Sequence, residues 1–141
     1  MKLKHLLCSM FAALVLAALP AYAQKPTINP GGVCENQVDS LTGTYLCAPS
    51  STLIDQTYLA IYGNNFNGLE SVTFSSSETG TQSLPIESFS TTQIDVCLKL
   101  TETNITNGTL TINTGHGSSA PFSSINVTTW QPAYGMTKCT T

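Results

Sequence analysis

Few residues of this chain could do covalent chemistry. Nucleophilic catalysis needs a serine or cysteine beside a base, and His116 is the single histidine after residue 5. It lies between Gly115 and Gly117, a turn sequence that is typical of a solvated loop residue. The serines fall in no nucleophile-elbow motif. We therefore predict that the chain has no catalytic residues.

Carboxylates and turn oxygens offer two further kinds of site. A pair of acids such as Glu87 and Asp95 could hydrolyse a glycosidic bond. Calcium could use the oxygen atoms of Asp39, Asp55 and the asparagine-rich turn 64–67. However, acids on the outer face of a sheet usually serve solubility, and the sequence has no Asp-x-Asp-x-Asp-Gly loop. We therefore predict no metal and no cofactor, and rank a glycosidase below a binding protein.

The aromatic residues are better candidates for ligand contact. In residues 57–62, Leu59 and Ile61 alternate with Tyr58 and Tyr62, which predicts a strand with the two tyrosines on its outer face. An exposed flat ring gives contact area at low entropic cost and suits a sugar or a protein partner. The predicted binding face consists of Tyr45, Tyr58, Tyr62, Trp130 and Tyr134. The alternative is that neighbouring segments fold over this face and bury the rings.

Cysteine usage indicates disulfides. Cys34, Cys47, Cys97 and Cys139 follow the N-terminal segment, and an even number in an exported chain favours two bridges, with three pairings open. Cys34 and Cys47 enclose a short polar loop, which favours a local bridge. Cys97 would then pair with Cys139 and tie the tail to the sheet. No CxxC spacing occurs, which counts against a zinc site.

The first 23 residues have the three regions of a secretory signal peptide. Lys2 and Lys4 form a basic start, an apolar run extends from residue 6 to residue 19, and small residues end at Ala23. The apolar run is shorter than the ~20 residues that cross a bilayer, so a membrane anchor is the weaker alternative. We expect cleavage after Ala23 and a secreted or periplasmic protein that is not inserted in a membrane.

The charge of residues 24–141 counts against nucleic acid as a partner. This segment has three lysines, no arginine and eight acids, a formal charge of −5. Binding to a phosphate backbone needs clustered basic side chains. Charged residues are scarce and Ser, Thr and Asn are abundant, which is typical of an extracytoplasmic β-rich domain with a neutral polar surface. The length fits a single domain.

Further alternating segments follow residue 57. They lie at residues 72–74, 84–89, 93–100, 109–113 and 122–128, and turn signals separate them. Phe66 is expected to fold back beneath the turn that starts at Gly63, and Asn107-Gly108 predicts a sharp reversal. No segment has helical periodicity. The sequence therefore predicts an all-β, Ig-like antiparallel β-sandwich of about seven short strands.

Two segments stand outside this pattern. Pro26 and Pro30 restrict the lead-in to an edge strand or an extended segment, because proline cannot donate to a ladder. Residues 32–56 contain two cysteines and breaker residues, and we interpret them as a disulfide-fastened N-terminal insertion, with a small hairpin between Asp39 and Tyr45. Residues 129–141 form a C-terminal tail.

The succession of motifs resembles the IPT/TIG family of immunoglobulin-like domains. The motifs occur in the family's order over most of residues 26–127: Pro26-Thr27-Ile28-Asn29-Pro30-Gly31-Gly32, Leu59-Ala60-Ile61-Tyr62-Gly63-Asn64-Asn65-Phe66, Val72-Thr73-Phe74, Thr92-Gln93-Ile94-Asp95-Val96 and Gly108-Thr109-Leu110-Thr111-Ile112-Asn113-Thr114-Gly115-His116-Gly117. The insertion and the cysteine-bearing tail depart from the family pattern. The resemblance implies a β-sandwich and a non-catalytic binding or scaffolding role.

These observations favour an exported, non-catalytic binding module that contacts a protein or a surface glycan outside the cell, in a host association if the source lives in a host. One alternative is a carbohydrate-binding accessory protein or a small secreted hydrolase. Another is a structural subunit of a surface assembly that adds a strand to its neighbour. Three sequons begin at Asn104, Asn107 and Asn126 and matter only in a eukaryotic secretory pathway.

Overall fold

The computed structural model describes residues 24–38, 45–50, 52–102, 104–130 and 138–139. The predicted signal peptide, residues 1–23, lies outside these ranges. Within them, no helix is long and apolar enough to cross a membrane.

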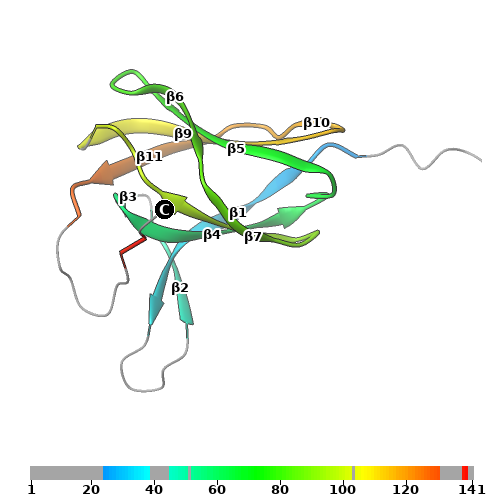
Figure 1. Cartoon of the computed structure of the whole chain (residues 1–141), viewed down its shortest axis with the longest axis horizontal. Helices are drawn as coiled ribbons and strands as arrows, with labels where there is room; N and C mark the ends of the chain where they lie inside the picture. The colour runs from blue at the N-terminus through cyan, green and yellow to red at the C-terminus, as the bar shows by residue number, and fades with distance from the viewer. Residues whose placement is uncertain (1–23, 39–44, 51, 103, 131–137, 140–141) are drawn as a thin grey trace, which may run out of the picture.

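Two sheets pack face to face as two layers (Figure 1). The first, here called the β4 sheet, has the order β2 (Tyr45–Pro49), β1 (Thr27–Val38), β4 (Thr57–Asn64), β8 (Gln93–Leu98) and β7 (Ile86–Phe89). The second, the β9 sheet, has the order β3 (Thr52–Ile54), β11 (Phe122–Thr128), β9 (Ile105–Thr114), β5 (Leu69–Ser76) and β6 (Gly80–Leu84), and β10 (Gly117–Ser118) pairs with β9. The predicted all-β sandwich is confirmed.

Two details of the fold prediction are wrong. The described residues form eleven strands rather than about seven, because the N-terminal region supplies β2 and β3 and the short strand β10 follows β9. The segment expected as one strand at residues 84–89 is also divided at Pro85, between β6 in one sheet and β7 in the other. The sandwich is also not purely antiparallel, since β3 runs parallel to β11. β3 enters the β9 sheet directly after the chain leaves the β4 sheet, so its direction is set by that crossing rather than by a hairpin.

The core lies between the sheets and follows the predicted alternation. Leu59 and Ile61 of β4 are fully buried, and so are the inward residues of β5, β8 and β9: Val72, Phe74, Ile94, Val96, Leu98, Leu110 and Ile112. Each such side chain contributes about 1.5–3 kcal/mol by leaving water. Period-two burial on both sheets therefore provides the main stabilisation of the sandwich.

The turn after β4 is closed by an aromatic side chain. Phe66 is fully buried, as predicted, and a Cβ on Gly63 would lie 2.5 Å from Cζ of its ring and 1.9 Å from the Thr27 carbonyl oxygen. Only glycine leaves room for both neighbours at this position. Asn65 adopts a positive φ of 62°, which reverses the chain after β4.

The Asn107-Gly108 dipeptide does not make the predicted reversal. Both residues lie inside β9, where Asn107 has a φ of 55° and the pairing with β11 shifts register. A Cβ on Gly108 would lie 2.1 Å from Cζ of Phe74. The two residues therefore make an irregularity inside the strand that seats the Phe74 ring, rather than a turn between strands.

The described strands of the predicted insertion, residues 32–56, belong to both sheets. β1 continues without a break through Gly32 and forms a hairpin with β2, while β3 crosses to the β9 sheet. β1 pairs with β4 only as far as Glu35, and β2 and the end of β1 project away from the two layers (Figure 1). β2 pairs only from Cys34 onward. The part of β1 around Pro30 therefore has no strand beside it on the β2 side, which suits a proline because it has no N–H to donate.

The tail is attached to the β4 sheet by a disulfide. Cys97 is bonded to Cys139, which confirms this pairing, and the Cys139 N–H donates to the Gln56 carbonyl at 2.9 Å. This bridge fastens the C-terminal tail, not the N-terminal insertion. Cys34 is also disulfide-bonded. The side chain of Cys47 lies outside the described residues, so the pairing of Cys34 with Cys47 stays a prediction.

Candidate ligand-binding site

The two tyrosines of β4 share the outer face of the β4 sheet with the outward residues of β8. The antiparallel register aligns Tyr62 with Gln93, Ala60 with Asp95 and Tyr58 with Cys97. Tyr58 and Tyr62 are four residues apart, which separates their Cα atoms by about 13 Å at the rise of a strand. Ala60 lies between them on the same face and is fully buried.

A cavity of about 420 Å³ opens at this place, here called the outer-face groove. Its lining comes from four adjacent strands or their ends: Asn36 of β1, Tyr58 and Tyr62 of β4, Gln93 and Asp95 of β8, and Glu87 and Ser88 of β7. The sheet thus brings together side chains that lie up to 59 positions apart in the sequence, from residue 36 to residue 95.

The Asp95 carboxylate is held in one orientation within the groove. The Ser88 hydroxyl donates to its Oδ2 at 2.6 Å, and the Gln93 side-chain amide donates to its Oδ1 at 3.0 Å. Each carboxylate oxygen can accept a further hydrogen bond. The Asp95 carboxylate is therefore a hydrogen-bond acceptor of fixed orientation between the two tyrosines, and two neutral side chains hold it in place.

A smaller hollow of about 170 Å³ adjoins the groove over β7. It shares Ser88, Gln93 and Asp95 with the groove and adds Phe89 and Ser90. Phe89 is 56% exposed, a high value for a phenylalanine. The site therefore has a third aromatic side chain at the edge of the β4 sheet.

The groove is acidic. Glu87 and Asp95 line it, and no lining residue is basic. The Asp95 carboxylate accepts from two neutral side chains, those of Ser88 and Gln93, so an added anion would be repelled by it and the groove suits a neutral or cationic ligand.

The structure gathers part of the predicted binding face. Tyr58 and Tyr62 are half-buried and line the groove, so neither full burial nor full exposure describes them. Trp130 is not among the lining residues, and its Nε1 is buried without a hydrogen-bond partner in the described part of the chain. The side chain of Tyr45 and all of Tyr134 lie outside the described residues.

Several lining residues were not predicted as part of a binding face. Gln93 alternates with buried Ile94, a signal that could have placed it beside Asp95 on the outer face. Ser88 lies opposite Asp95 because the pairing of β7 with β8 shifts register between Ile86 and Ser88, and no sequence pattern predicts this shift. Asn36 comes from the region interpreted as an insertion. Its place in the groove depends on the pairing of β1 with β4.

The other candidate residues lie apart from the groove. His116 is exposed in the turn between β9 and β10, where its backbone N–H donates to the Thr114 hydroxyl at 3.2 Å. Asp55 is buried and accepts from the Leu100 N–H at 2.9 Å and from the Gln56 side chain at 3.2 Å, which is a structural role. Asp39 lies outside the described residues, among which no cluster of three or more His, Cys, Asp or Glu side chains could hold a metal.

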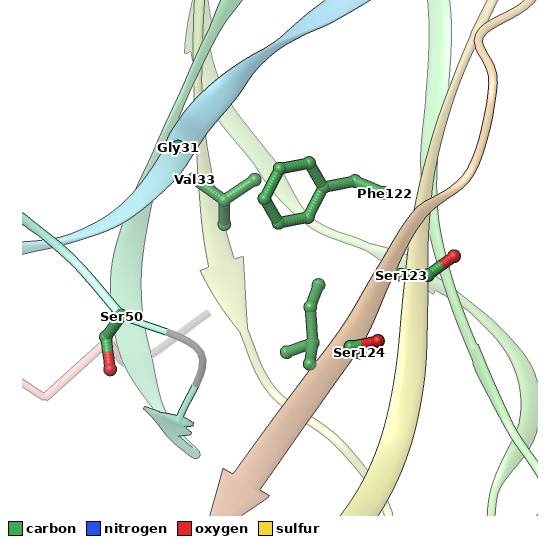
Figure 2. Close-up of a pocket in the computed structure, with 7 residues that line it drawn as sticks. Gly31, Val33, Ser50, Phe122, Ser123 and Ser124 are labelled. Atoms are coloured by element: carbon green, nitrogen blue, oxygen red, sulfur yellow. The ribbon is translucent and has the colours of Figure 1, made fainter.

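A second hollow of about 270 Å³ lies between the two sheets, at the side formed by β1 and β11. Figure 2 shows Val33 and the Phe122 ring pointing toward one another across the gap, with the hydroxyls of Ser50 and Ser123 directed away. Its inner wall is apolar and it presents no charged group. This crevice is a place where the sandwich closes incompletely rather than a site with polar groups aimed at a ligand.

Comparison with known proteins assigns no family to the chain. No protein-family model matches it, and no curated protein shows a significant match. The resemblance to the IPT/TIG family therefore stays an expectation based on the order of the motifs, and a functional proposal has to start from the geometry of the outer-face groove.

Proposed function

We propose that this chain is an exported, non-catalytic binding module that contacts a protein or glycan outside the cell through the outer-face groove. The observation that supports this proposal most directly is the juxtaposition of Tyr58 and Tyr62 with the fixed carboxylate of Asp95 in one cavity. Binding sites combine apolar contact surface with a few polar groups in defined positions, and this groove has both.

Export is supported by the N-terminal pattern and by the cysteines. Residues 1–23 have the sequence of a cleavable signal peptide, and disulfides such as Cys97–Cys139 persist mainly in oxidising compartments. The motif order shared with the IPT/TIG family supports a binding role. The protein would therefore act in the periplasm or outside the cell.

A second candidate function, a small secreted hydrolase, is favoured by one observation. Glu87 and Asp95 line the same groove, and glycosidases use two carboxylates. Turnover of an oligosaccharide by the wild-type protein, with loss of activity in both Glu87→Gln and Asp95→Asn, would favour the hydrolase over the binding module.

A structural role is favoured by the free edge of the β4 sheet. β7 pairs with β8 on one side only and has two exposed apolar side chains, Ile86 at 36% and Phe89 at 56%. Such an edge can accept a strand from a neighbour. Assembly that grows with protein concentration and is lost in Phe89→Lys would support this alternative.

The binding proposal is tested by comparing the wild-type protein with a Tyr58→Ala/Tyr62→Ala double variant. The control is Thr111→Ala, a half-buried position on the outer face of the β9 sheet. We expect the wild type and the control to be retained on a panel of bacterial and animal cells and the double variant to be washed off. Equal retention of all three proteins would contradict the proposal.

A further inference from the structure

We propose that the ligand of the outer-face groove is an uncharged oligosaccharide, with sugar rings against Tyr58 and Tyr62 and hydroxyl groups that donate to Asp95. This inference rests on the proposed function and specifies the chemistry of its ligand. Three features of the groove favour this class of ligand: the spacing of the tyrosines, the type of the polar groups and the sign of the charge.

The tyrosine spacing favours a ligand of more than one sugar unit. The Cα atoms of Tyr58 and Tyr62 are about 13 Å apart along β4. A ligand that contacts both tyrosines therefore has to follow β4 over several residues. A chain of sugar rings can cover both positions, and its C–H faces pack on aromatic rings as other apolar surfaces do.

The polar groups of the groove match hydroxyl groups. Sugar hydroxyls are donors and acceptors at once, and so are the side chains of Asn36, Ser88 and Gln93. Asp95 adds a charged acceptor whose orientation is set by Ser88 and Gln93. Hydrogen bonds to a charged acceptor are stronger than those between neutral groups. Asp95 is therefore the residue expected to select among sugars by the position of their hydroxyls.

The charge excludes acidic sugars. The Asp95 carboxylate accepts from the neutral side chains of Ser88 and Gln93, so a uronic or sialic acid would bring a second carboxylate against it. A neutral ligand avoids this repulsion. Its binding also depends little on salt, because salt screens interactions between charges.

The first experiment measures retention on the same cell panel before and after mild periodate oxidation, which cleaves the vicinal diols of sugars. We expect periodate to abolish retention of the wild type. Retention that resists periodate but still requires the two tyrosines would overturn the glycan assignment and leave the binding module intact. Retention that is independent of the tyrosines, or no retention on any cell, would overturn the binding module and the glycan assignment together.

The second experiment titrates the purified protein with three ladders of one to six units: neutral α- and β-linked hexose oligosaccharides, uronic acid oligosaccharides and glucosamine oligosaccharides. We expect the neutral ladder to bind more tightly with length until both tyrosines are covered. We also expect about tenfold weaker binding in Tyr58→Ala and in Tyr62→Ala. Tyr62→Phe, which keeps the ring, should retain most of the affinity and serves as the control for folding.

The charged ladders provide the opposing outcomes. Preferential binding of the glucosamine ladder, with strong salt dependence and loss in Asp95→Asn, would replace the neutral sugar by a cationic ligand. Preferential binding of the uronic ladder would contradict the charge assignment. Failure of all three ladders, together with periodate-resistant retention, would assign the groove to a protein partner.

Discussion

The outer faces of the two sheets have the same alternation and differ in what they present. On the β9 sheet the outward residues of β5 and β9 are Ser, Thr and Asn, and these satisfy one another across strands. Asn113 donates to the Ser71 hydroxyl at 3.0 Å, and Thr73 donates to the Thr111 carbonyl at 3.5 Å. On the β4 sheet, tyrosines and acids surround a hollow. The polar side chains of the β9 sheet therefore bond to one another, whereas the tyrosines and acids of the β4 sheet line a cavity that a ligand can enter.

The largest effect on stability should come from the buried residues beneath the two outer faces, which are similar in the two sheets. Leu59 lies under the groove and Leu110 under the β9 face, and both are fully buried. We expect Leu59→Ala and Leu110→Ala each to lower the free energy of unfolding by about 2–5 kcal/mol. Chemical denaturation measures both values. A cost at Leu59 far below that at Leu110 would show that the two layers do not share one core.

The next largest effect on stability should come from the disulfide that joins the tail to the β4 sheet. The Cys97–Cys139 bridge spans 42 residues and lies at the position opposite Tyr58. Its removal in Cys97→Ala/Cys139→Ala should cost about 2–4 kcal/mol, because the unfolded chain gains freedom. Thermal unfolding with and without reductant tests this. The double variant should show a lower Tm, and reductant should shift its Tm by less than it shifts that of the wild type, in which Cys34 is disulfide-bonded as well.

Ligand binding should distinguish the two faces most clearly. Tyr62→Ala removes one aromatic surface of the groove and should weaken binding about tenfold, or ~1.4 kcal/mol. Thr111→Ala on the β9 face should leave the affinity unchanged, since that face has no role in the proposed site. Isothermal titration measures both. A comparable loss of affinity in the two variants would contradict the assignment of the binding site to the β4 sheet alone.

A smaller effect should follow from loosening the Asp95 carboxylate. Ser88→Ala deletes the hydroxyl that donates to Oδ2 and should weaken binding by about 0.5–1.5 kcal/mol. The matched change on the other face is Ser71→Ala, which deletes an acceptor of Asn113 and should not affect binding. Unchanged affinity in Ser88→Ala would show that the orientation of Asp95 does not matter.

The smallest effect lies in the turn between β5 and β6 of the β9 sheet. A hydrogen bond from the Ser77 hydroxyl, with further donors, lowers the pKa of exposed Glu78 from 4.5 to about 2. A lowered pKa stabilises the folded state above the unfolded value. This contribution should therefore disappear as the pH falls from about 4.5 to about 2. An NMR titration of Glu78 tests the value, and Glu78→Gln should remove this part of the pH dependence of stability.

The residues that alternate strictly were the ones that could be placed in advance. Leu59 and Ile61 were expected inside and Tyr58 and Tyr62 outside, and the structure agrees. The pairing of Cys97 with Cys139 was also predicted. By contrast, Asn107-Gly108 suggested a turn and lies within β9, because space for the Phe74 ring decides its place. A dipeptide preference is weaker than the packing of a buried aromatic ring.

The candidate site was predictable only in its central strand. The tyrosines of β4 and the acid at position 95 were recognised separately, as aromatic surface and as a carboxylate. That they meet follows from the register of β4 with β8, which no local pattern contains. Phe89 and Ser88 enter through the irregular pairing of β7 with β8. A site assembled from four strands depends on pairings between distant residues.

The sequence by itself determined the period-two burial, the scarcity of charge, the cysteines and the absence of helical periodicity, and hence a small β-sandwich. These properties are local, because side chains on a strand alternate whatever the strand pairs with. Only the tertiary structure decided which strands are neighbours, that β2 and β3 belong to different sheets, and that Asn36, Tyr58, Tyr62, Ser88 and Asp95 surround one hollow. Strand order and register are set by how the two layers fill the core between them, and that is a property of the whole chain.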